Sequence, residues 1–159
     1  MSNYGKSVTF VLNAEGGLVN ASSDHGGMTN FGISSKQYPD LDIANLTRRQ
    51  AMDIYFRDYW TPGQCEVMSW PVDCVHLDAS VNSGIKQSTR FLQEAANVPV
   101  DGQLGPITLS AIREMDPAAL AYQAIQARRV FFNRIAVNDQ VKFLAGWLKR
   151  CDDLEAFIK

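Results

Sequence analysis

The sequence has few cysteines, little net charge and no long hydrophobic run, and each shortage excludes a class of protein. Its three cysteines are Cys65, Cys74 and Cys151, an odd number at irregular spacing that does not form a disulfide framework. They are typical of reduced, mostly buried thiols in a protein made in a reducing compartment. The formal net charge of -2, without a run of like charges, gives no basis for nucleic-acid binding or for attraction to an anionic membrane.

No segment has the length and apolarity of a membrane span or of a secretory leader. The N-terminal run over residues 8–12, VTFVL, is interrupted by Thr9 and is too short for the apolar region of a signal peptide. We therefore expect a protein that is made in the (host) cytoplasm without a signal peptide and that does not insert stably into membranes. If its substrate lies in the cell wall or periplasm, the protein must be released to it by a pore or by lysis.

The composition and the helical periodicity predict a mainly α protein. With 46% hydrophobic residues, 20% charged residues, three Trp and eight Phe among 159 residues, the chain can fill the core of one compact body. The capping box Thr47-Arg-Arg-Gln50 predicts a helix to about Trp60, and Asp116-Pro117 predicts the start of a long helix. Asn138 or Asp139 is expected to cap the last helix.

A central buried helix is expected over residues 72–83, because this segment is apolar almost all the way round and ends at Gly84. Two halves of the chain meet just after it. We expect residues 1–84 to form one region and residues 85–159 to form a second, helical region that packs on the first as one compact body.

The segment AEGGLVNASSDHGGMTNFGIS, residues 14–34, contains the side chains best placed for acid catalysis. Glu15 stands where an apolar helical run, predicted over residues 3–13, stops before two glycines. The helix dipole disfavours negative charge at that end, which favours a carboxyl group that keeps its proton. A general acid needs such a proton near neutral pH. The alternative is a surface glutamate ahead of a glycine cap.

Asp24 and Thr29 follow in a Gly-rich stretch without helical periodicity, which we expect to be an ordered loop or a small hairpin. An acid at Glu15 and a second polar group that positions water form the arrangement of a glycoside hydrolase. Asp24 could instead hydrogen-bond its own backbone in an Asx-turn, and Thr29 could be an ordinary strand residue.

Other candidates lie in predicted helices. Asp78 and Asn82, at i and i+4 on the apolar central helix, must either hydrogen-bond each other or another partner, or face a cleft. Tyr59 and Trp60 end a helix and either join the core or stack on sugars. Cys74, His76 and Asp78 alternate along one helix and so point in different directions, and we expect no metal site there.

The N-terminal motif resembles the signature of glycoside hydrolase family 108, which comprises N-acetylmuramidases of phage endolysins and secretion activator proteins. The motif consists of Glu15-Gly-Gly, Val19-Asn20 and DHGGMTNFGI over residues 24–33, with further matches at Ile54-Tyr55, Tyr59-Trp60 and residues 78–84. The C-terminal half resembles the predicted peptidoglycan-binding region usually fused to that domain, at residues 91–93, at VDGQLGPIT over residues 100–108 and at Gly146-Trp147.

The resemblance covers nearly the whole chain and implies a lysozyme-like α fold with peptidoglycan as the partner and no cofactor. It implies cleavage of the β-1,4 bond between N-acetylmuramic acid and N-acetylglucosamine, with Glu15 as the catalytic acid and Asp24 and Thr29 positioning water. We expect a monomeric, bacteriolytic enzyme. The candidates for binding the saccharide are Asn30, Tyr59, Trp60, Asp78 and Asn82.

Other functions stay open at this stage. If Asp24 points away from the site, Glu15 alone could act as in a lytic transglycosylase, and the product would be an anhydro sugar. A non-catalytic peptidoglycan-binding or envelope protein could have the same lysozyme-like fold. It would bind through its C-terminal half, with the turn at Asp101-Gly102. A metal-dependent amidase would require a metal site.

Overall fold

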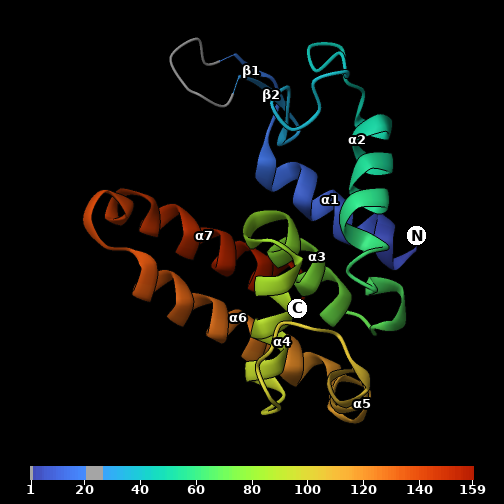
Figure 1. Ribbon diagram of the computed structural model, residues 1–159, viewed down its shortest axis with the longest axis vertical. Coiled ribbons are helices and arrows are strands. Elements are labelled where there is room, and N and C mark those ends of the chain that lie inside the picture. The colour runs from blue at the N-terminus through green and yellow to red at the C-terminus, as the bar shows by residue number, and fades with distance from the viewer. Residues whose placement is uncertain (1, 21–26) are drawn as a thin grey trace.

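The structure is a computed structural model, and it describes residues 2–20 and 27–159. The expected mainly α architecture is confirmed. Figure 1 shows α1 and α2 beside a small sheet at one end of the molecule, α3 in the middle, and α6 and α7 as a long pair of neighbouring helices. The α-helices are α1 (Asn3–Glu15), α2 (Arg48–Tyr55), α3 (Val72–Ser83), α4 (Ile85–Ala95), α5 (Pro106–Glu114), α6 (Pro117–Ile135) and α7 (Val141–Phe157).

The small hairpin expected after the first helix is part of a three-stranded antiparallel sheet in the order β1 (Val19–Asn20), β2 (Met28–Asn30) and β3 (Ile33–Ser34). Thr29 pairs with both neighbouring strands. The turn between β2 and β3 contains Phe31 and Gly32, both with positive φ angles of 51° and 76°. This sharp turn brings β3 back along β2 next to the end of α1.

The helix ends that the sequence predicts from capping residues are confirmed in two cases and wrong in one. Thr47 and Gln50 form the reciprocal capping box of α2, which continues as a π-helical turn over Phe56–Trp60. The Asp116 side chain accepts a hydrogen bond from the Ala119 amide at 2.8 Å. The expected cap of the last helix is wrong, because residues 138–140 form a 3-10 turn that starts at a positive φ of 51°, and α7 begins only at Val141.

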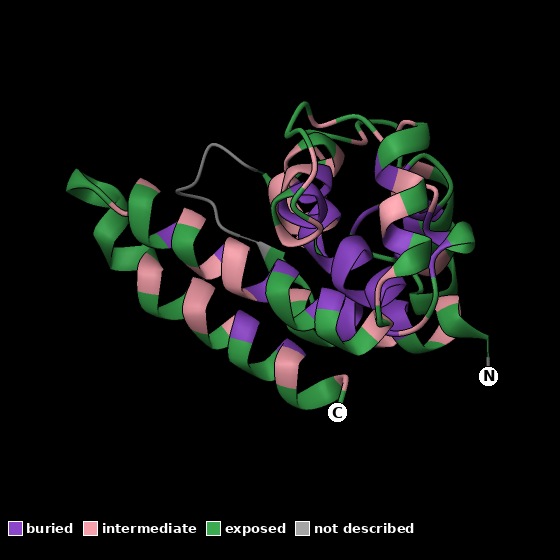
Figure 2. Cartoon of the chain, turned by 90° about the horizontal axis from the view of Figure 1, so that it is seen from below, coloured by how far each residue is buried: buried purple, intermediate pink, exposed green. Residues whose placement is uncertain are grey.

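The central helix α3 is buried from Val72 through Ser80 and takes part in two hydrophobic clusters. Val75 packs in the cluster formed with α4, α6 and α7, whereas Leu77 packs in the cluster formed with α1, α2 and β3. Buried residues therefore gather around the middle of the molecule, and the turn that joins α6 to α7 is exposed (Figure 2). Within residues 2–20 and 27–159, no helix is long and apolar enough to cross a membrane.

The buried His76 of α3 gives the fold a testable dependence on pH. Burial lowers the pKa of His76 to about 4, and its Nδ1 lies 2.7 Å from Ser88 Oγ on α4. The unfolded chain takes up this proton near pH 6.5, so the unfolded state binds more protons than the folded state between these values. The contribution of the neutral His76 to the free energy of unfolding is therefore fully present above this pH window. It is lost as the pH falls through the window, by about 3 kcal/mol in total.

We expect His76→Gln to remove this acid-side loss, so that the difference in unfolding free energy between wild type and variant changes by about 3 kcal/mol from pH 7 to pH 4. Urea unfolding at several pH values measures the difference. Taking the difference cancels the opposite contribution of Asp73, whose pKa is raised by burial. Parallel pH profiles for the two proteins would contradict the prediction.

Candidate active site

Glu15 is the last residue of α1 and lines a small pocket. Gly16 ends the helix at a φ of 80°, and its amide donates to the Leu12 carbonyl. The Glu15 side chain is 22% exposed and borders a pocket of about 90 Å³. The other lining residues come from the turn after β2, the following loop, the α2 segment and α3: Gly32, Ile33, Gln37, Tyr38, Tyr55, Tyr59 and Val81. Among these described lining residues, Glu15 carries the one carboxyl group.

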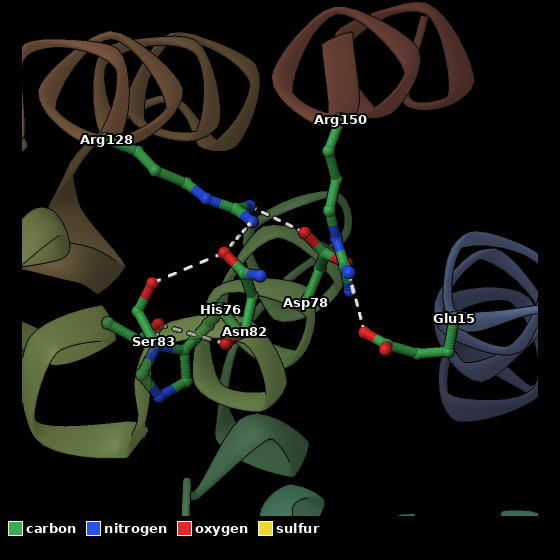
Figure 3. Close-up of polar contacts among 8 residues, drawn as sticks. Glu15, His76, Asp78, Asn82, Ser83, Arg128 and Arg150 are labelled. Atoms are coloured by element: carbon green, nitrogen blue, oxygen red, sulfur yellow. Dashed lines mark hydrogen bonds and ion pairs between the residues drawn. The ribbon is translucent and has the colours of Figure 1, made fainter. Parts of the chain in front are cut away.

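Arg150 of α7 reaches Glu15 from the opposite end of the chain. Its Nη1 lies 2.6 Å from Glu15 Oε1, while its Nε and Nη2 donate to Asp78 Oδ1 at 3.0 and 2.7 Å. Figure 3 shows this guanidinium between the carboxylates of α1 and α3. The neighbouring charges of Asp78 and Glu15 raise the pKa of Arg150 against the opposing effect of burial. Arg150 is therefore a permanent cation that joins the two carboxylates.

Asp78 is fully buried and paired on both oxygens. Its Oδ2 lies 2.6 Å from Arg128 Nη1 of α6, and its Oδ1 accepts from Arg150. Burial alone raises the pKa of a carboxyl, but Arg128 and Arg150 hold the pKa of Asp78 below its ordinary value. Arg128 also donates to Asn82 Oδ1 at 3.0 Å (Figure 3). Asp78 and Asn82 are therefore joined through Arg128, and Asn82 in addition borders a groove at the surface.

Neither arginine was among the site residues predicted from the sequence, although a signal was present. Arg128 lies among the apolar positions of α6, three residues after Ile125 and four before Phe132, and Arg150 stands three residues after Trp147 in α7. Charged residues at such positions are expected to face a buried partner. Identifying that partner requires the fold, because Asp78 lies 50 residues from Arg128 and 72 from Arg150.

A backbone turn and a tyrosine form the part of the pocket wall that lies beside Glu15. The Tyr55 hydroxyl donates to the Phe31 carbonyl at 2.7 Å, and burial together with the charge of Glu15 raises the pKa of Tyr55. The tyrosine is therefore a neutral donor at physiological pH. Gly32 lies so close that a Cβ there would stand 2.8 Å from both Glu15 Oε2 and the Tyr55 hydroxyl.

The remaining candidate residues differ in their surroundings, and of these Tyr59 lines the pocket. The Tyr59 hydroxyl accepts from Gln37 at 3.3 Å. Thr29 is half-buried on the middle strand of the sheet. Asn30 is buried and donates to the Ile43 and Leu46 carbonyls, so its amide anchors a loop. Trp60 is buried against Tyr4 in the core.

Asp24 falls outside the described residues. Its position relative to Glu15 therefore stays a prediction of the sequence.

Comparisons with known proteins find two family models and a solved structure that this chain resembles. Residues 8–84 match the family model Glycosyl hydrolase 108, and residues 87–152 match the model Predicted Peptidoglycan domain. A structure of Brucella abortus SagA superposes with a TM-score of 0.81 at 28% sequence identity, covering 96% of this chain and 91% of that chain. No curated protein matches the sequence. The fold is thus the lysozyme-like helical fold that the sequence resemblance implied.

The contact between Gly32 and Glu15 predicts that a methyl group at this position disturbs the site. Gly32→Ala places an L side chain at a φ of 76° and within 2.8 Å of Glu15, so we expect both a loss of stability of about 1–3 kcal/mol and a loss of enzymatic activity. Gly84→Ala is the matched control, because it carries a similar φ of 84° with no atom within 4 Å. Equal activity of the two variants, assayed on peptidoglycan, would contradict the prediction.

The Asp78 ion pairs predict that Arg150 matters for stability as well as for the site. Arg150→Met leaves a fully buried carboxylate with Arg128 as its one remaining described cationic partner, so we expect the free energy of unfolding to fall by about 3 kcal/mol. Arg57→Met, which breaks the surface pair with Asp58, is expected to change it little. Urea unfolding of both variants checks the prediction, and similar losses would disprove it.

Proposed function

The chain belongs to glycosyl hydrolase family 108, and we propose that this glycoside hydrolase of peptidoglycan is an N-acetylmuramidase with Glu15 as its general acid. The bond cleaved is the β-1,4 bond between N-acetylmuramic acid and N-acetylglucosamine. The observation that supports this assignment best is the position of Glu15. It is the one carboxyl group among the described residues of the pocket wall, at the end of α1.

Glu15 would donate its proton to the glycosidic oxygen as the bond breaks through an oxocarbenium-like state. Asp24, which lies in sequence between β1 and β2, would activate water on the opposite face of the sugar, with Thr29 holding that water. This arrangement gives inversion when the two carboxyl groups lie about 6.5–9.5 Å apart. Tyr38, Tyr55 and Tyr59 supply aromatic surface and hydroxyl groups beside Glu15, which suit a saccharide.

Glu15 forms an ion pair with Arg150, whereas a general acid must hand its proton to the leaving oxygen as the bond breaks. Arg150 already donates two hydrogen bonds to Asp78, so it keeps a charged partner when the contact to Glu15 opens. We therefore infer that substrate separates Arg150 from Glu15 before the acid acts.

Glu15→Gln is expected to lower the rate of muropeptide release by about 10²–10⁴-fold, because the amide cannot donate an acidic proton. The measurement is mass spectrometry of the products released from purified peptidoglycan. Glu94→Gln, an exposed glutamate on α4, is the matched control and should retain full activity. Products from the wild type should carry reducing-end N-acetylmuramic acid.

The alternatives give different results in the same experiment. Products that end in anhydro-muramic acid would still support Glu15 as the acid. They would identify the reaction as transglycosylation and not hydrolysis. If neither wild type nor variant released material while both bound peptidoglycan, the protein would be a binding protein and the proposed hydrolysis would be wrong.

A further inference from the structure

A second cavity, distinct from the pocket at Glu15, lies on the other side of Arg150. It is a groove of about 430 Å³ between the end of α1, the end of α3 and the middle of α7. Building on the proposed muramidase function, we propose that this groove is a subsite for a neutral saccharide unit of the glycan strand, next to the bond that is cleaved. The residues that matter for this inference are Asn13, Asn82, Gly146, Trp147, Lys149 and Arg150.

The groove and the pocket are adjacent along two helices. On α1, Glu15 lines the pocket while the preceding Ala14 lines the groove, and on α3 Val81 lines the pocket while Asn82 lines the groove. Arg150 lines the groove and contacts Glu15. A ligand that occupies both cavities must therefore pass the Glu15 carboxyl group, as a glycan cleaved in its interior would.

The two cavities differ in volume, and the larger one has the volume of a ligand site. Pockets that hold small ligands usually measure about 300–1,000 Å³. The pocket at Glu15, of about 90 Å³, is below this range, whereas the groove, of about 430 Å³, is within it. The groove thus provides the larger share of the room that a sugar unit needs.

The charges around the groove are paired, which favours a neutral ligand. Lys149 Nζ lies 2.6 Å from Asp153 Oδ2, and Arg150 is shared between Asp78 and Glu15. A carboxylate of a stem peptide would have to compete with these partners. The groups that remain are the amide of Asn13, the amide nitrogen of Asn82, whose Oδ1 accepts from Arg128, and the indole of Trp147. Such a set of amide and aromatic groups recognises sugars.

The shape of the groove depends on Gly146. This glycine lies inside α7, where alanine is the better helix former. A Cβ at this position would have no atom within 4 Å, so no packing requires glycine here. A larger side chain at position 146 would instead extend into the groove, which gives a way to block the groove without removing any contact.

The test compares Gly146→Phe with Ala145→Phe, each in the Glu15→Gln background so that the substrate stays intact. Ala145 is the exposed neighbour on α7 and is not a groove residue, so it controls for an added surface phenylalanine. We expect Gly146→Phe to raise the Kd for purified sacculi by about tenfold or more, and Ala145→Phe to change it less than about twofold. Gly146→Ala, which adds one methyl to open space, should bind normally and unfold at a higher temperature.

Two results would overturn the proposal. Equal Kd values for Gly146→Phe and Ala145→Phe would show that the groove does not bind the strand. A steep loss of affinity of the Glu15→Gln protein between 50 and 500 mM salt would indicate recognition of charge instead of a neutral sugar. Failure of the proposed function is separate, because it would appear as the absence of products from the wild type while the dependence of binding on position 146 persisted.

Discussion

The structure depends on the burial of one carboxylate, Asp78, between two arginines. A buried ion costs several kcal/mol unless charged partners and hydrogen bonds surround it. Asp78 meets this condition because Arg128 of α6 and Arg150 of α7 engage its two oxygens. The central helix, the long helix α6 and the C-terminal helix are thereby held in one relative position. Apolar packing alone is less directional, since two helices can slide past each other without exposing a charge.

The same ion-pair network places a C-terminal residue in the N-terminal site. Arg150 lies within the segment that matches the peptidoglycan domain, whereas Glu15 lies within the segment that matches the hydrolase family. Their side chains nevertheless meet at 2.6 Å although the residues are 135 positions apart. The C-terminal segment is therefore more than an attached binding module, because it supplies the charge that faces the candidate acid.

Helix ends and short motifs that depend on residues close in sequence could be predicted from the sequence. The cap of α2 depends on Thr47 and Gln50 three residues apart, and the end of α1 depends on the glycine that directly follows Glu15. The motif around Glu15 indicated the family for the same reason, since its residues are close in sequence. The start of α7 was predicted wrongly because Asn138 adopts a positive φ, which a short asparagine side chain tolerates and which favours a turn before the helix.

Long-range partners could not be predicted in this way. Asn30 was a candidate for contacting the substrate, yet its amide donates to the carbonyls of Ile43 and Leu46 in a loop that follows it in the sequence. The partners of Asp78 were missed because each arginine is separated from it by at least 50 residues. A polar residue on an apolar helix shows that a partner must exist, but it does not show which one.

Helix α7 then combines two requirements that explain its composition. Arg150 must point inward to neutralise Asp78, and Cys151 and Leu154 must be buried against the core. The preceding turn of the same helix carries Gly146 and Trp147 at the groove. A glycine inside a helix lowers the stability of the helix. The buried ion pairs of Arg150, one turn later, hold α7 in place despite this loss. The ion pairs of Arg150 thus allow a glycine at position 146, and this glycine leaves the groove beside the candidate catalytic acid open.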